Sequence, residues 1–200
     1  MSAQMGLFGP SVRVSAHRMG WGRGDVLRFV RNVAPLAAKT VEQHFGRRLQ
    51  PVQITLTTAD GIAELACRAE YQFAPELPAR EKADGLRLAR RNAKDAAGHV
   101  VLDPRSRGTL MFLNVRADAM RVPDGIVTTV AHELVHCDQL GRRGIRELLI
   151  AHARHEFGVE AMAAQDALAC ERMVDDHERE AYGLEDALAR QVLAALPSPA

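Results

Sequence analysis

Apolar residues recur at three- and four-residue steps through three long stretches of the chain, a spacing typical of helices. These stretches are residues 25–45, 126–140 and roughly 158–196. The first contains Pro35, which we expect to kink or split the helix. The second is apolar around most of its circumference, so it predicts a buried helix that starts near Pro123 and stops at Gly141.

Shorter segments between these stretches have the character of β-strands. Residues 52–57 alternate between apolar and polar side chains, which predicts a half-buried strand. Residues 99–103 and 109–115 are two further short strands, joined by a turn that contains Pro104 and Gly108. Residues 60–73 are compatible with either a helix or a strand. The chain is therefore expected to fold as an α+β protein, with a small, mostly antiparallel sheet backed by helices.

Two regions lack a clear apolar period. Residues 1–22 are rich in glycine and polar residues, and we expect an irregular N-terminal arm. Residues 75–97 are rich in charge and interrupted by proline and glycine, which indicates an exposed and mobile insertion. The rest of residues 23–196 is expected to form a single domain, because 200 residues suit one compact unit.

Composition restricts the possible partners and the compartment. The formal net charge is +1, so the chain shows no electrostatic preference for nucleic acid. No apolar run approaches the length of a membrane span, and the first 20 residues lack the apolar stretch of a signal peptide. The three cysteines, Cys67, Cys137 and Cys170, are widely spaced and odd in number, which argues against a disulfide framework. A cytoplasmic location is expected.

One motif within the predicted buried helix carries chemistry. His132-Glu133-Leu134-Val135-His136 matches the H-E-x-x-H pattern of zinc-dependent hydrolases. Residues four apart lie on one face of a helix, so both imidazoles can point at one metal ion. Glu133 would lie beside the metal and could take a proton from zinc-bound water. A buried helix with two hydrogen-bonded core histidines is the plainer interpretation, but the polar residues of an otherwise apolar helix favour a metal site.

A catalytic zinc ion needs a third protein ligand, which must come from another segment. His152 and His155 follow the motif by 16 and 19 residues. Acidic residues lie further on, in the third helical stretch, and several of them form a polar stripe at three- and four-residue steps. The members of this stripe are Glu171, Asp175, Glu178, Tyr182 and Glu185.

The motif and the segment Glu178-Arg179-Glu180-Ala181 together resemble the gluzincins, a superfamily of zinc metallopeptidases that includes thermolysin and the short minigluzincins. The resemblance covers about residues 98–194. It implies a zincin-like fold, one zinc ion per chain held by His132, His136 and Glu178, and Glu133 as the general base. Glu180 and Glu171 are the alternative third ligands. Members of the family often have an aspartate four residues after the ligand glutamate, where it orients a histidine, and this chain has Tyr182 there.

The resemblance also implies a function. The chain is expected to be a zinc metallopeptidase that hydrolyses peptide bonds of a peptide or protein substrate, with residues 109–115 as the strand at the rim of the cleft. The oxyanion donor is open among Tyr182, His177 and His155, and Asp175 is a further candidate to support the site. Two alternatives are a catalytically silent binding module of zincin-like fold and a hydrolase of small amides. Sequence alone predicts no oligomeric state.

Overall fold

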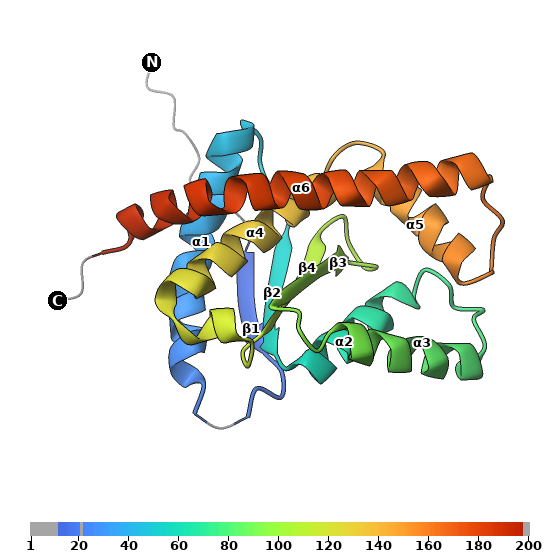
Figure 1. The fold of residues 1–200 in the computed structure, drawn as a ribbon, viewed down its shortest axis with the longest axis horizontal. Helices are drawn as coiled ribbons and strands as arrows, with labels where there is room; N and C mark the ends of the chain where they lie inside the picture. The colour runs from blue at the N-terminus through green and yellow to red at the C-terminus, as the bar shows by residue number, and fades with distance from the viewer. Residues whose placement is uncertain (1–11, 21, 198–200) are drawn as a thin grey trace, which may run out of the picture.

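The computed structural model describes residues 12–20 and 22–197. Within them, six α-helices surround an open four-stranded mixed sheet, in an α+β arrangement (Figure 1). A short 3₁₀ helix, η1, precedes the motif helix. In chain order the elements are β1 (Val12–Ala16), α1 (Gly24–Phe45), β2 (Val52–Thr57), α2 (Ala59–Glu70), α3 (Ala79–Asn92), β3 (Gly98–Leu102), β4 (Thr109–Asn114), η1 (Asp118–Arg121), α4 (Pro123–Leu140), α5 (Ile145–Glu156) and α6 (Ala164–Ala195).

The sheet is mixed, so the expectation of a mostly antiparallel sheet is wrong. Its strand order is β1-β2-β4-β3, and the pairs β1–β2 and β2–β4 are parallel. Only β3 and β4 are antiparallel. The reason is the connections. The single helix α1 returns the chain from β1 to β2 in the same direction, whereas two helices, α2 and α3, lead from β2 to β3 in the opposite direction, and the short turn to β4 restores the direction of β2.

This strand order also corrects the strand expected at the cleft rim. The segment predicted there, 109–115, contains β4, which lies inside the sheet between β2 and β3. The edge strand next to the motif helix is β3, since α4 contacts β3 more extensively than β4. An edge strand has one row of backbone groups that no neighbouring strand pairs.

The predicted N-terminal arm is partly wrong. Residues 12–16 form β1, which pairs in register with β2 from Val12–Val52 to Ala16–Leu56. Val12 and Val14 pack against the main core, so one face of this edge strand is directed inward. The remaining residues of the predicted arm include 1–11 and 21, which lie outside the described residues.

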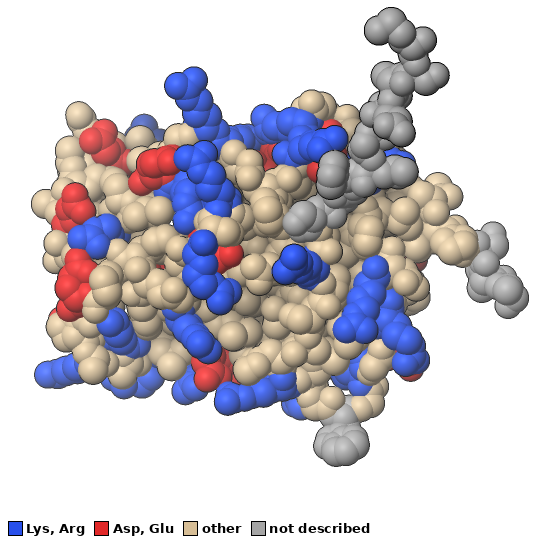
Figure 2. Space-filling model, turned by 180° about the vertical axis from the view of Figure 1, so that it is seen from behind, with Lys and Arg blue, Asp and Glu red and all other residues tan. Residues whose placement is uncertain are grey.

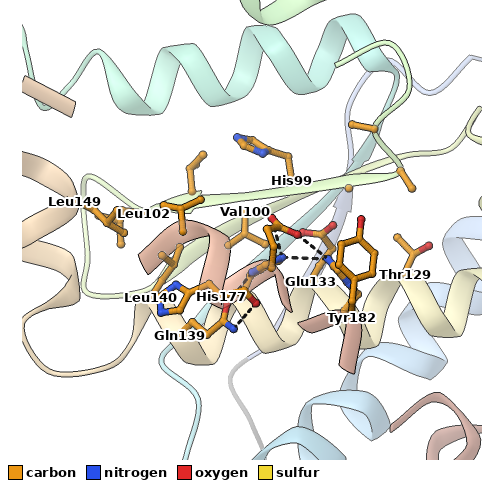
Figure 3. Close-up of a pocket in the computed structure, with 18 of the residues that line it drawn as sticks. His99, Val100, Leu102, Thr129, Glu133, Gln139, Leu140, Leu149, His177 and Tyr182 are labelled. Carbon is orange, nitrogen blue, oxygen red and sulfur yellow. Dashed lines mark hydrogen bonds and ion pairs between the residues drawn. The ribbon is translucent and has the colours of Figure 1, made fainter. Parts of the chain in front are cut away.

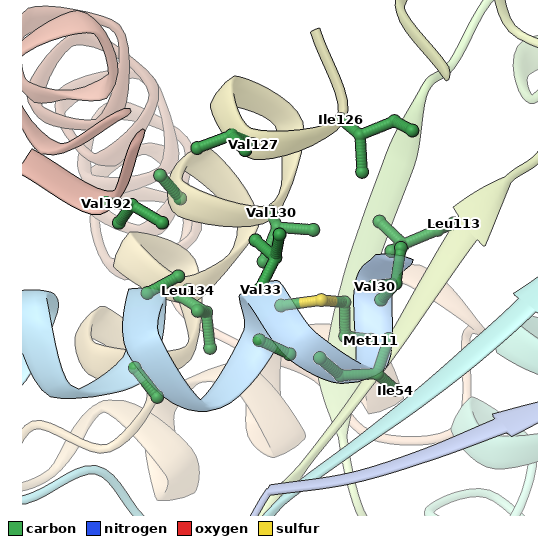
Figure 4. Packing of buried hydrophobic residues seen from close by; sticks show 14 of the residues in the cluster. Val30, Val33, Ile54, Met111, Leu113, Ile126, Val127, Val130, Leu134 and Val192 are labelled. Atoms are coloured by element: carbon green, nitrogen blue, oxygen red, sulfur yellow. The ribbon is translucent and has the colours of Figure 1, made fainter. Parts of the chain in front are cut away.

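The main core lies between the sheet and the helices α1 and α4. Valines of both helices interlock with Ile54, Met111 and Leu113 of the central strands, as Figure 4 shows. Helix α1 is continuous across Pro35, so the expected split is absent. Pro35 has no N–H to donate to the carbonyl group four residues earlier, at Arg31. Both residues are exposed, so water can bind that carbonyl group instead. Helix α4 begins at Pro123 and ends before Gly141, as predicted.

Helix α2 covers the opposite face of the sheet beside β3 and β4. A smaller apolar cluster joins it to Val101 and Phe112, and Ala93 extends the cluster beyond α3. The charged segment 75–97 is therefore largely helical: α3 occupies 79–92 and has no buried residue. Its mobility stays a prediction.

Helix α6 runs along the outside of the molecule, over α4 and α1 at one end and past α5 at the other (Figure 1). It begins at Ala164, later than the sequence predicted, because the chain first forms α5 and then an extended segment. The face in Figure 2 carries more Lys and Arg than Asp and Glu, spread between uncharged surface. No helix of the described residues is long and apolar enough to span a membrane.

Candidate metal centre

Helix α4 brings the two motif histidines together on one face. The Nε2 atoms of His132 and His136 lie 3.1 Å apart, and the side chains are 12% and 16% exposed. Helical spacing of four residues produces this proximity, and the strongly apolar remainder of α4 anchors the helix in the core. Two imidazole nitrogens therefore face the same small volume.

Helix α6 supplies a carboxylate to the same volume. Glu178 places one oxygen 3.7 Å from His132 Nε2 and the other 3.5 Å from His136 Nε2. Zinc binds histidine and carboxylate ligands at about 2.0–2.2 Å, so a tetrahedral arrangement separates its ligand atoms by about 3.3–3.5 Å. The separation of the two histidine nitrogens, and the distance from each nitrogen to one oxygen of Glu178, bracket this value. His132, His136 and Glu178 could thus hold one metal ion.

The other ring nitrogen of each histidine is already engaged. His132 Nδ1 lies 2.8 Å from a carboxylate oxygen of Glu185, and His136 Nδ1 lies 2.8 Å from Gln139 Oε1. Both partners are acceptors, so each Nδ1 carries the hydrogen and donates it. The lone pairs of both imidazoles then lie on Nε2 and point at each other across 3.1 Å. A cation between them would remove this repulsion, and fixing the tautomer in this way is typical of metal-binding histidines.

The orientation of Gln139 is itself fixed by a buried network. This side chain is fully buried, and its Nε2 donates to the backbone oxygen of His177 and to Glu180, both at 2.9 Å. Arg142 also donates to Glu180 at 2.7 Å. Because two acceptors surround its nitrogen, Gln139 must present its oxygen to His136. Glu180 is committed to this network, which argues against it as the third ligand.

Glu133 lies behind the two histidines, on the side of β3. The residue is 6% exposed, and a Cβ atom at Gly98 would lie only 2.4 Å from Glu133 Oε1. Only glycine therefore allows β3 to approach the carboxyl group this closely. Burial, and then the negative charge of Glu178, raise the pKa of Glu133 to about 8. A carboxyl group with such a pKa can both accept and release a proton near neutral pH.

These residues line a cavity of about 750 Å³, drawn in Figure 3. Apolar side chains, among them Leu102, Leu140 and Leu149, lie at one end, and Thr129 and Tyr182 lie at the other. The His99 ring lies on the opposite side of the β3 ribbon from Glu133, yet both residues line the cavity. The cavity therefore extends around the free edge of β3, and its volume suits a ligand of small-molecule or short-peptide size.

The remaining predicted site residues divide into two groups. Tyr182 and His177 line the cavity; Tyr182 is 65% exposed, and its ring centre lies 4.8 Å from that of His132. His155 is directed elsewhere, because its Nδ1 accepts a hydrogen bond from the backbone of Met162. Asp175 and Glu171 are exposed residues of α6 that do not line the cavity.

Four residues of this site escaped the sequence-based prediction. Glu185 belongs to the polar stripe of α6, seven residues after Glu178, and this spacing could have identified it as a partner of the nearer histidine. Gln139 follows His136 by three residues, a spacing that places both on one helix face. No local pattern identifies Gly98 or Glu70, since only the tertiary structure brings them to the cavity.

Comparisons with protein-family models, with curated proteins and with solved structures found no match to this chain.

Proposed function

We propose that the protein is a zinc-dependent metallopeptidase of gluzincin type. The observation that carries the proposal is the arrangement of three side chains whose donor atoms lie within 4.8 Å of one another, with both histidines oriented through Nδ1. His132, His136 and Glu178 would hold the ion. When bound, zinc would polarise the scissile carbonyl group and lower the pKa of water.

Glu133 is the general base of this proposal. Its carboxyl group lies in the same cavity as the histidines and is shielded from bulk solvent. An oxygen of Glu133 would take the proton of the attacking water and then deliver it to the departing amine. The contact with Gly98 fixes the carboxyl group against β3, so it would not have to reorganise during either transfer.

Tyr182 is the favoured donor to the developing oxyanion. Its phenol is exposed, lines the cavity and adjoins the ring of His132. His177 is the second choice. Burial, and then the positive charge of Arg142, lower the pKa of its imidazole, which favours the neutral form. A neutral imidazole is a weaker donor than a phenol held at the cavity mouth would be.

A peptide is the favoured substrate because the cavity follows the free edge of β3. An extended chain can add to such an edge by main-chain hydrogen bonds, and alternate side chains then enter the adjoining pockets. The apolar end formed by Leu102, Leu140 and Leu149 would accept an apolar side chain next to the cleavage site.

Zinc analysis combined with peptide cleavage tests this proposal. Wild-type protein should bind about one zinc ion per chain and cleave members of a random peptide mixture, with products identified by mass spectrometry. Glu133→Gln should keep zinc and lose about 10²–10⁴-fold of the rate, because glutamine cannot accept the proton. The control is Glu81→Gln on α3, outside the cavity, which should leave the rate unchanged. Zinc binding without cleavage of any peptide would instead support a binding module.

A further inference from the structure

The cavity has a second wall that the proposed reaction does not use. Glu70, at the end of α2, lines it together with Phe73, on the side of β3 remote from Glu133. Within residues 12–20 and 22–197, no side chain forms an ion pair or a hydrogen bond with the Glu70 carboxylate. The residue is half-buried, and no cation of the protein offsets the hydration that its carboxylate loses.

The hydrogen-bonding pattern of β3 shows how a bound peptide would reach this wall. Ala97 and Asp103 bond to β4, through Asn114 and Gly108 respectively. In an antiparallel pair such bonds fall on alternate residues, so residues 99 and 101 also face β4. The backbone groups of residues 98, 100 and 102 then point to the free edge, where a peptide strand would bind.

Alternation also assigns the side chains of that peptide to two walls. Gly98 faces Glu133 and Val100 packs on the main core, so one face of β3 is the metal-centre face. Val101 belongs to the cluster beneath α2, and His99 lies on that same face. Successive side chains of a peptide added to β3 would alternate between these faces. Every second one would enter the part of the cavity that contains Glu70.

We propose that Glu70 selects substrates with an arginine or lysine side chain at the positions directed to the α2 face of β3. This inference rests on the proposed function and adds its substrate class. A long cationic side chain suits the wall, because its apolar stem can run past Phe73, whose ring Arg146 also approaches, while its charged end reaches the carboxylate. Burial raises the pKa of Glu70 to about 7, with no charged neighbour contributing, so a bound cation would also favour the ionised form.

Cleavage specificity is the first test. Peptide mixtures should give products enriched in Arg or Lys at alternate positions around the cleavage site, with kcat/KM about 10- to 100-fold above that of norleucine analogues. Glu70→Gln should abolish this ratio, and Glu70→Lys should invert it in favour of Asp and Glu. The matched control is Glu64→Gln, on the same helix but paired with Arg18 outside the cavity. Cleavage by wild type without a basic preference would overturn the inference and leave the peptidase proposal standing.

A binding measurement separates the two proposals. Nuclear magnetic resonance titration of Glu133→Gln with acetyl-arginine amide and acetyl-norleucine amide should show tighter binding of the arginine compound, lost on adding Glu70→Gln. This result without any peptide cleavage would support the subsite and contradict the peptidase. Equal binding of the two amides would overturn the inference, whatever the cleavage assay shows.

Discussion

The two walls that meet at β3 differ in how their polar groups are paired. On the metal-centre side, His132, His136 and Glu180 all have side-chain partners, and the buried Asp138 of α4 pairs with two arginines. On the side of α2 and α5, Glu70 has no partner, and the buried Nε2 of His152 has none among the residues described. Glu133 also has no hydrogen-bond or ion-pair partner among the described residues, so on the metal-centre side it is the two histidines and their supporting network that are paired.

This difference indicates two tasks. A satisfied network holds its members in one geometry, which a metal centre requires, since ligand and support must stay within a fraction of an ångström. A partly buried polar group without a protein partner loses part of its hydration, and it gains a partner when a ligand binds. We infer that the groups on the metal-centre side hold the two histidines in one geometry, and that Glu70 on the other side binds a group of the ligand.

The largest effect should come from removing a ligand of the proposed metal centre. Glu178→Ala should reduce zinc from about one ion per chain to nearly none, because two histidines alone leave the tetrahedral site half-formed. Glu180→Ala is the matched variant two residues away, and it should retain most of its zinc, since Glu180 supports His136 only through Gln139. Elemental analysis after dialysis measures both. Loss of zinc from Glu180→Ala, with Glu178→Ala unaffected, would exchange the two roles.

Gly98 tests whether Glu133 depends on the close approach of β3. In Gly98→Ala the new methyl group must displace Glu133 or the strand, and a displacement of about 1 Å can reduce kcat/KM by about 100-fold. Zinc content should remain, because the ligands come from α4 and α6. Gly183→Ala is the control: a Cβ there meets nothing within 4 Å, so activity should persist. Full activity of Gly98→Ala would show that β3 moves freely.

Removing a hydrogen-bond partner of a ligand should have a smaller effect than removing the ligand. Glu185→Leu leaves His132 Nδ1 without an acceptor and should weaken zinc binding by about 10–100-fold. Glu185→Gln keeps an acceptor oxygen and should retain most of the affinity. Competition with a zinc-sensitive dye measures both dissociation constants. Equal affinities for these two variants would show that the contact does not support the metal centre.

The sequence predicted those parts of the molecule whose cause is local. Helix α4 and its paired histidines follow from apolar period, terminal signals and four-residue spacing within one segment. The strand β2 follows from six alternating residues. In each case the residues that determine the helix or strand are neighbours in the chain, so a short segment of the sequence is enough to predict it.

The errors concern relations between segments. The two parallel strand pairs could not be anticipated. One needs β1, whose inward valines gain meaning only from pairing with β2, and the other needs β2 to pair with β4 rather than with β3. Likewise the approach of Glu178 to the two histidines depends on how α6 crosses α4, and no spacing along the chain fixes that crossing. The choice of Glu178 over Glu180 used the polar stripe, which is a property of α6 alone.

The smallest expected effect concerns the pH dependence of stability, and it tests the unsatisfied wall directly. The pKa of Glu70 is about 7 in the folded protein, above its ordinary value of 4.5. The neutral carboxyl group therefore favours folding fully below pH 4.5, and this contribution is lost as the pH rises through about 7. The loss should reach about 1–3 kcal/mol in wild type. Glutamine at position 70 does not titrate. Between pH 5 and 8 the free energy of unfolding of Glu70→Gln should therefore fall by about 1–3 kcal/mol less than that of wild type.

Urea unfolding with a chelator present isolates this contribution, because metal binding then adds nothing and the other titrating groups cancel between wild type and variant. Glu64→Gln, on the exposed side of the same helix, should behave as wild type does. If Glu70→Gln also followed the wild-type pH dependence, Glu70 would be satisfied in solution, and the contrast between the two walls of the cavity would disappear. A reduced pH dependence would show instead that the fold maintains this carboxylate at a cost in stability, as expected of a group that is kept for binding rather than for folding.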